Sequence, residues 1–237
     1  MASGLVIARE DYAIGSVDRG EVLRYLGYRG QSVSPELDER LDALIARAIE
    51  VASPRGALRS FRVAGRTDDE VTLAGTTLAL RGRDIAGHLA DAVEVVVFAV
   101  TLGLGTDREL RLLSATDSLA QVVVDSASST LVERAADAAN ARAVAYAASL
   151  GMHASWRFSP GYGDMPLDSQ PDFLAATDAT RRLGITLTDS NLMIPTKSVT
   201  AVVGIHPTPQ PDSQGSCPIC SFREFCSLRK SGRTCHG

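Results

Sequence analysis

A stiff, polar loop near residue 160 has residue types that could bind a charged ligand. Residues 156–164 read WRFSPGYGD and place Arg157, Tyr162 and Asp164 around Pro160 and Gly161. Glycine lets a ligand approach the backbone closely, and proline limits backbone motion. Arginine can hold a carboxylate through two parallel hydrogen bonds, and a tyrosine ring offers a flat face to a cation or a large ring. A structural loop with a surface arginine explains the same residues, so both interpretations stay open here.

The second group with chemical potential is a cluster of four cysteines at the end of the chain. They have the spacing C-x2-C-x5-C-x8-C, and no cysteine precedes them: Cys217, Cys220, Cys226 and Cys235. Clustered cysteines in a cytosolic chain more often bind a metal than form disulfides. Four thiolates can hold a [4Fe–4S] cluster or complete a tetrahedral zinc site. We expect an iron–sulfur cluster, with zinc as the alternative and unligated or redox-active thiols as a third reading.

Composition and charge exclude several classes of function. The chain has 237 residues, of which 45% are hydrophobic, and its net charge is −4. It therefore has no general basic character to attract nucleic acid or anionic lipid. The longest apolar stretch, 93–104, is shorter than the ~20 residues that cross a bilayer, and the N-terminus lacks the pattern of a signal peptide. We expect a cytoplasmic protein that binds neither nucleic acid nor membrane. His88, His153 and His206 are isolated, which favours structural roles.

Hydrophobic periodicity and turn residues predict the elements that position the loop. Helices are expected at 18–28, 34–52, 82–91, 117–150 (alanine-rich, with one possible break) and 172–183, and β-structure at 58–80, 93–101, 185–188 and 198–205. No regular βαβ alternation and no GxGxxG motif are present, so we predict an α+β fold. We divide the chain into a main domain at 1–206, a proline-rich linker at 207–216 and a cysteine-rich metal-binding tail at 217–237.

Two blocks of residues resemble the activation domain of cobalamin-dependent methionine synthase. The first block is the Arg-x-x-Pro-Gly-Tyr pattern of residues 157–162. The second is the pattern Gly-Ile-x-Leu-Thr-x-Ser-x-x-Met-x-Pro of residues 184–195, followed by Ser198-Val199 and His206-Pro207. The resemblance covers residues 117–207. The cysteine tail is also locally similar, over 218–223, to the cluster-binding turn of iron–sulfur nucleases of the RecB-like group.

The resemblance implies a fold, two cofactors and a partner. The family fold is a twisted antiparallel sheet with flanking helices. A member binds S-adenosylmethionine and docks over the cobalamin of a methionine synthase or a related corrinoid methyltransferase. It supports remethylation of the oxidised cofactor, for which an electron donor is needed. We expect this domain to be carried on a chain separate from the methyltransferase, so that the cobalamin would belong to a partner protein and an iron–sulfur tail could relay the electron.

The resemblance also assigns roles to individual residues. Arg157 matches the arginine at the methionine end of S-adenosylmethionine, and Tyr162 matches the tyrosine that faces the corrin ring. Ser159 sits where the family uses a backbone contact, and Gly161 in the same loop is a further expected cofactor-binding residue. By helix alignment alone, without a motif, Glu133 corresponds to a family acid near the amino group, whereas a solvated charge on an amphipathic helix is the favoured explanation for it. After Tyr162 this chain has Gly-Asp-Met-Pro-Leu, where methionine synthase has proline and then Cys-Pro-Asp-His. The alternative function is a non-catalytic docking module for a corrinoid protein with a structural zinc tail.

Overall fold

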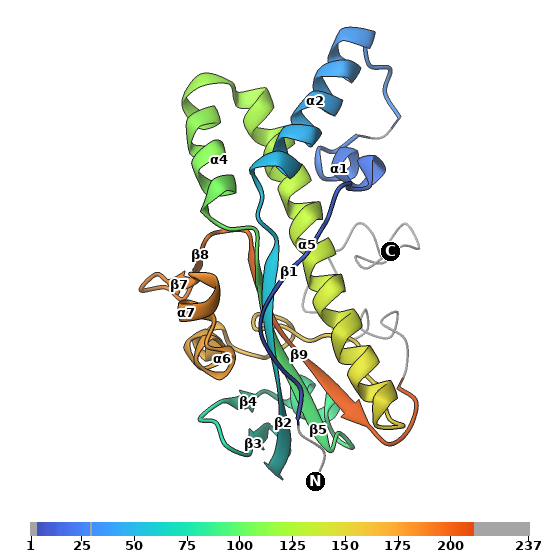
Figure 1. The fold of residues 1–237 in the computed structure, drawn as a ribbon, viewed down its shortest axis with the longest axis vertical. Coiled ribbons are helices and arrows are strands. Elements are labelled where there is room, and N and C mark those ends of the chain that lie inside the picture. Colours follow the sequence, from blue (N-terminus) through green and yellow to red (C-terminus); the bar gives the residue numbers. More distant parts are fainter. Residues whose placement is uncertain (1–3, 29, 211–237) are drawn as a thin grey trace.

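The computed structural model describes residues 4–28 and 30–210, which form an antiparallel sheet with helices on both of its faces (Figure 1). In chain order the elements are β1 (Val6–Asp11), α1 (Arg19–Tyr25), α2 (Pro35–Val51), β2 (Arg55–Arg66), β3 (Glu70–Leu73), β4 (Ala79–Arg81), α3 (Arg83–His88), β5 (Glu94–Thr101), α4 (Leu104–Thr116), α5 (Ser118–Ser149), β6 (His153–Ala154), the 3-10 turn η1 (Leu167–Ser169), α6 (Gln170–Thr177), α7 (Ala179–Leu183), β7 (Thr186–Leu187), β8 (Met193–Ile194) and β9 (Ser198–His206). This arrangement confirms the predicted α+β class. The linker beyond Gln210 and the cysteine tail lie outside the described residues.

The main sheet has the strand order β4-β3-β2-β5-β9-β6, with β1 paired to β2, and its pairs are antiparallel. β5 lies between β2 and β9 and is buried from Val95 to Thr101. Its side chains alternate between the two faces, so Val95 and Val97 pack in one core cluster and Val96 and Phe98 in another. A strand buried on both faces needs apolar residues at every position, which explains the continuous run VVVFAV.

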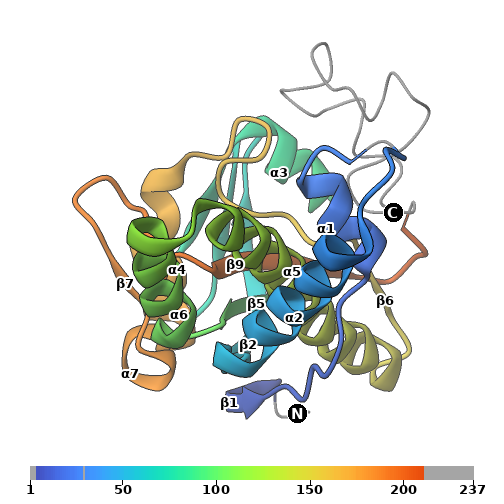
Figure 2. The ribbon, with the colours of Figure 1, turned by 90° about the horizontal axis from the view of Figure 1, so that it is seen from above.

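The long helix α5 covers one face of the sheet (Figures 1 and 2). It has 32 residues without a break, and Asp117 caps its first turn by accepting a hydrogen bond from the N–H of Ala120 at 3.0 Å. The predicted break is therefore wrong. Alanines at positions 135, 136, 139, 143 and 147 are buried against the sheet. Their small side chains let the helix approach the strands closely, which explains why this segment is rich in alanine.

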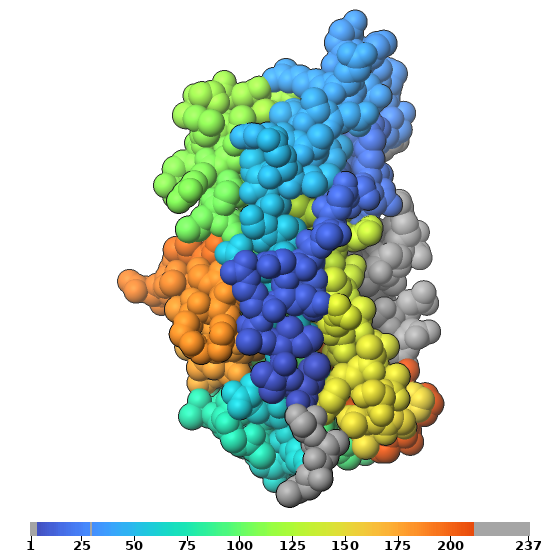
Figure 3. Space-filling view, viewed as in Figure 1, coloured from blue at the N-terminus to red at the C-terminus, as the bar shows by residue number. Residues whose placement is uncertain are grey.

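Helices α6 and α7 cover the opposite face and pack on Ala57 and Ala99 of the two central strands. The sequence predicts one helix here, but Asp178 takes a left-handed conformation (φ 56°) and separates the two. Gly184 ends α7 at φ 75°, as predicted from its position. In the space-filling view, β1 forms a strip of surface with α5 on one side and the α6–α7 region on the other (Figure 3). The elements that the sequence did not predict are the helix α4 and the strands β1, β6 and β8.

Helices α1, α2 and α4 pack around the first half of α5 and form a separate core cluster (Figure 2). α2 begins as predicted, because the hydroxyl of Ser34 accepts the N–H of Leu37 and Pro35 occupies the first helical position. Gly105 at the start of α4 faces the carbonyl oxygen of Val51, where a Cβ would lie only 2.2 Å away. Close packing of α4 against the end of α2 therefore explains the glycine at position 105. No helix among the described residues is long and apolar enough to span a membrane.

Candidate functional site

A cavity of about 410 Å³ lies along the open edge of β9. β6 pairs only with Ile205 and His206, and a single bridge joins Phe158 to Val202, so the first part of β9 has no strand partner on this side within residues 4–28 and 30–210. The lining comes from four segments: Glu133 of α5, the loop 157–162, residues 167–170 and residues 191–200. The volume lies within the usual range of small-molecule sites, ~300–1,000 Å³.

Arg157 is the charged centre of this cavity and is held by two carboxylates of α5. Its Nη2 lies 2.7 Å from Oε2 of Glu133, and its Nη1 lies 2.6 Å from Oδ1 of Asp137. The two acids are four residues apart and so lie on one face of the helix. Burial disfavours the charge of Arg157, but the hydrogen bonds and charges of Asp137 and Glu133 outweigh burial and raise the pKa of the guanidinium. The three groups together carry a net charge of −1 (+1 − 1 − 1).

The loop after Arg157 is held by backbone hydrogen bonds and by α3. Gly161 has φ 91°, a conformation that side chains disfavour, and its N–H donates to the carbonyl of Met165 at 2.9 Å. The carboxylate of Asp164 accepts the N–H groups of Arg83 and Asp84 at 2.7 and 3.1 Å. In Figure 2 the chain between β6 and α6 accordingly loops past α3. Asp164 therefore anchors the loop and does not line the cavity.

Ser159 and Tyr162 line the cavity, whereas Gly161 is not among the lining residues, and the cofactor-binding roles expected of all three stay predictions. Tyr162 is 41% exposed and lies at the end of a row of rings. Its ring centroid is 6.3 Å from that of Phe158 in an edge-to-face arrangement, and Phe158 stacks on Trp156 at 5.3 Å. The buried ring of Phe158 and the partly buried ring of Trp156 hold the tyrosine at the rim, where a large flat partner could meet it.

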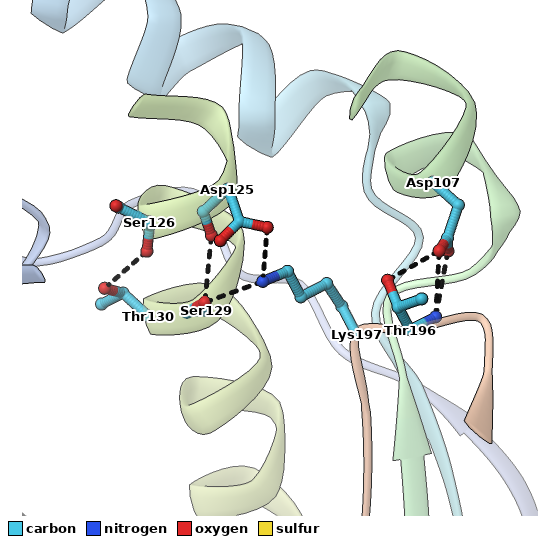
Figure 4. Close-up of polar contacts among 7 residues, drawn as sticks. All are labelled: Asp107, Asp125, Ser126, Ser129, Thr130, Thr196 and Lys197. Atoms are coloured by element: carbon cyan, nitrogen blue, oxygen red, sulfur yellow. Dashed lines mark hydrogen bonds and ion pairs between the residues drawn. The ribbon is translucent and has the colours of Figure 1, made fainter. Parts of the chain in front are cut away.

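The turn between β8 and β9 forms another wall of the cavity and is held from two helices (Figure 4). Asp107 of α4 accepts the N–H of Thr196 at 3.0 Å. On the other side, Nζ of Lys197 lies 2.8 Å from Oδ1 of Asp125 and 2.9 Å from Oγ of Ser129, both on α5. Thr196 lines the cavity beside this anchor. These residues were not predicted from the sequence, although Lys197 is one of only two lysines in a chain with 24 Lys and Arg residues.

A buried polar pair, which was also not predicted from the sequence, lines the opposite side of the cavity. Gln170 at the start of α6 is 4% exposed, and Thr200 of β9 is 1% exposed. The hydroxyl of Thr200 donates to Oε1 of Gln170 at 2.7 Å. A glutamine with this burial is unusual, because apolar residues are far more often buried, but burial is known only from the structure and no sequence signal marked Gln170.

The remaining candidate residues lie away from this site. His88 donates from Nε2 to the carbonyl oxygen of Trp156 at 2.9 Å and packs on the ring of Trp156, which fits the structural role predicted for it. No group of residues that could hold a metal occurs in the described part of the chain. The predicted ligands Cys217, Cys220, Cys226 and Cys235 lie outside the described residues, so the metal site remains a prediction.

Comparison with known proteins identifies the family. Residues 85–212 match the family model described as "Vitamin B12 dependent methionine synthase, activation domain". The match covers more than half of the chain, and the protein belongs to this family. This confirms the predicted resemblance.

A solved structure agrees with the family at the level of the fold. The chain superposes with a TM-score of 0.66 on a structure described as "Crystal Structure of the MetH Reactivation Domain bound to AdoHcy", at 16% sequence identity. The alignment covers 95% of this chain and 86% of that chain. A comparison with curated proteins gives no match.

Proposed function

We propose that this protein binds S-adenosylmethionine in the cavity along β9 and supports reductive remethylation of the cobalamin of a separate methionine synthase or related corrinoid methyltransferase. Membership of the activation-domain family supports the general role. The related reactivation domain was crystallised with AdoHcy, the product that S-adenosylmethionine leaves after methyl transfer. The separate partner and its electron donor are parts of the proposal.

The observation that carries the proposal is the charged cluster around Arg157. S-adenosylmethionine has a carboxylate, an ammonium group and a sulfonium, with a net charge of +1. The cluster contains one cation and two anions and has the opposite net charge. Arg157 has five N–H donors, of which two are engaged by Glu133 and Asp137, so it can still donate to a ligand carboxylate. The carboxylate of Glu133, which also lines the cavity, is placed to accept from an ammonium group.

The rim of the cavity supports the proposed docking on cobalamin. When bound on a partner, cobalamin would supply the metal centre that accepts the methyl group. The residues of this chain would hold the methyl donor and orient it. Tyr162 is part of the lining and also 41% exposed, so its ring can touch both the bound donor and an approaching partner. The backbone hydrogen bonds of Gly161 and Met165 hold the tyrosine in position.

Calorimetry with S-adenosylmethionine tests the proposal directly. The wild-type chain should bind it, and Arg157→Ala should weaken binding by ~1.5–3 kcal/mol, the range for a hydrogen bond to a charged group. Thermal unfolding of the variant controls for loss of structure, because Arg157 also contacts α5. Absence of binding by the wild type, or equal affinity in the folded variant, would contradict the assignment.

The cysteine tail is proposed to hold a metal centre that delivers the electron. The spacing of Cys217, Cys220, Cys226 and Cys235 supports a [4Fe–4S] cluster, with zinc as the alternative. Anaerobically purified protein should have a broad visible absorption that disappears when Cys217 and Cys220 are both replaced by serine. A colourless protein that contains one zinc per chain would instead support a structural tail.

A further inference from the structure

The side-chain amide of Gln170 has hydrogen-bonding capacity that the described part of the protein does not use. Its Oε1 accepts from the hydroxyl of Thr200. The orientation of the amide with Oε1, and not Nε2, toward Thr200 is favoured because the Thr200 hydroxyl has no other acceptor among residues 4–28 and 30–210. The Nε2 then carries two N–H groups, and no described residue accepts from either.

An unused donor on a side chain that is only 4% exposed is uncommon, because burial without a partner costs free energy. The described side-chain atoms that are fully enclosed and lack a hydrogen-bond partner do not include Nε2 of Gln170. This unpartnered nitrogen is therefore not fully enclosed by the protein. The side chain lines the cavity. The donor is therefore available to a molecule that fills the cavity.

The two ends of the cavity lie on opposite faces of the sheet. Ala201 and Val203 of β9 face α5, whereas Val202 packs in the cluster on the other face. Thr200 alternates with Ala201 and so shares the face of Val202, and its bond to Gln170 of α6 agrees with this. Glu133 and Asp137, which hold Arg157, belong to α5. A ligand that reaches both Arg157 and Gln170 must extend around the edge of β9.

We propose that Gln170 is a ligand-binding residue whose amide N–H groups donate to acceptors on the adenosyl half of S-adenosylmethionine. This rests on the proposed function, in which Arg157 holds the carboxylate. The other acceptors of the molecule are the ribose oxygens and the adenine ring nitrogens, because its ammonium and sulfonium groups accept no hydrogen bond. The donors of Gln170, at the other end of the cavity, therefore meet the nucleoside half.

Two ligands and two kinds of variant test this assignment. 5′-Methylthioadenosine contains the adenosyl half, is uncharged and has no carboxylate for Arg157. Gln170→Glu keeps an acceptor for Thr200 and removes the N–H donors, and Gln170→Met removes both functions at similar size. Thr200→Val is the matched control, because it breaks the bond between the two side chains and leaves the Gln170 donors in place. Thermal unfolding confirms that each variant is folded before calorimetry.

Both Gln170 variants should weaken binding of 5′-methylthioadenosine by about five- to tenfold, and Thr200→Val should weaken it less. Arg157→Ala should leave that affinity unchanged while it weakens S-adenosylmethionine. Unchanged affinity for 5′-methylthioadenosine in folded Gln170→Glu would overturn the inference while the proposed function stands. Wild-type protein that binds S-adenosylmethionine but not millimolar 5′-methylthioadenosine would also overturn it. Failure of the wild type to bind either ligand would remove the proposed function as well.

Discussion

The ammonium group of Lys197 lies 2.8 Å from the carboxylate of Asp125 and joins the turn before β9 to α5 (Figure 4). The lysine side chain is 15% exposed and the aspartate 53% exposed, so the pair lies at the boundary of the protein interior. Ser129 accepts a second hydrogen bond from Nζ at 2.9 Å. The backbone carbonyl of Lys197 also accepts the N–H of Leu102. These contacts fix Thr196 and Ser198, which line the cavity.

Lys197→Met should destabilise the fold and weaken ligand binding together. Methionine keeps the aliphatic length of lysine but removes the charge and three donors, which leaves Asp125 without its partner. We expect a loss of roughly 1–2 kcal/mol of unfolding free energy, between the values for exposed and fully buried pairs. Affinity for S-adenosylmethionine should fall about three- to tenfold if the turn shifts. Chemical denaturation and calorimetry measure the two effects.

Asp125→Asn is the matched control for this anchor. Asparagine retains an oxygen acceptor for Lys197, so the turn should stay in place and ligand affinity should change less than in Lys197→Met. A Lys197→Met protein with wild-type affinity and stability would show that the backbone contacts of the turn suffice to hold the cavity wall.

Sequence patterns predicted the parts of the molecule that local chemistry determines. The start of α2 follows from Ser34 and Pro35, which are neighbours in the chain, and the end of α7 follows from one glycine. The buried strand β5 follows from its β-branched run. The split between α6 and α7 was missed because Asp178 adopts a left-handed conformation without the glycine that usually indicates one. β1 was missed because its burial is low and because its partner residues on β2 are 44 to 53 positions away, from the pair Asp11 and Arg55 to the pair Val6 and Arg59.

The residues of the candidate site also fall into two groups, those that belong to one local motif and those that only the fold brings together. Arg157, Ser159 and Tyr162 belong to one short motif and were found from it, and all three line the cavity. Their partners come from distant segments: Asp137 is 20 residues from Arg157, and Gln170 is 30 residues from Thr200. No periodicity or motif connects such positions, because only the packing of α5 and α6 on the two faces of β9 brings them together. The structure was needed to show that the cavity includes a buried amide.

Neutralising the acids around Arg157 should lower affinity for S-adenosylmethionine more than for S-adenosylhomocysteine. The first ligand carries a net charge of +1 and the second is net neutral, so only the first gains from a negative cluster. Both acids are about half exposed, and water screens their effect. We therefore expect Glu133→Gln to weaken S-adenosylmethionine selectively by about two- to fivefold. Competition binding with the two ligands measures the ratio.

Asp137→Asn serves as the comparison for Glu133→Gln. Both substitutions remove one negative charge and one contact with Arg157, but only Glu133 lines the cavity. The effect of Asp137→Asn on ligand selectivity should be smaller. If both variants weaken the two ligands equally, the acids only position Arg157 and do not select the sulfonium.

Tyr162→Ala should impair methyl transfer to a partner's cobalamin more than it impairs binding of the methyl donor. The ring is 41% exposed at the rim, whereas Arg157 is largely buried beside α5. Removing the ring should slow transfer by about tenfold or more, with a loss of S-adenosylmethionine affinity smaller than that of Arg157→Ala. Tyr162→Phe is the control, because it keeps the flat ring and should retain most of the transfer rate. Large loss of affinity with normal transfer would reverse the two proposed roles.

His88 should make the stability of the protein depend on pH between about 6.5 and 4. Burial lowers the pKa of His88 to about 4, although its hydrogen bond to the carbonyl of Trp156 opposes this effect and the nearby His206 adds to it. In the unfolded chain this histidine binds a proton near the ordinary pKa of ~6.5, whereas in the folded protein it stays neutral to lower pH. Its contribution to the free energy of unfolding is therefore fully present above about pH 6.5. The contribution is lost as the pH falls toward 4, with a total on the order of 3 kcal/mol.

Urea denaturation at pH 7, 6, 5 and 4 measures this dependence when wild type is compared with His88→Gln. Glutamine keeps an N–H donor for Trp156 and Ser155 but does not titrate. The variant should therefore lose less stability than the wild type on acidification. In the variant, residue 88 binds no proton in either the folded or the unfolded state, so it adds no pH dependence. The pKa of His206 is also lowered by burial, so some dependence should remain in the variant. Parallel stability curves for the two proteins would show that His88 binds its proton equally in the folded and unfolded states.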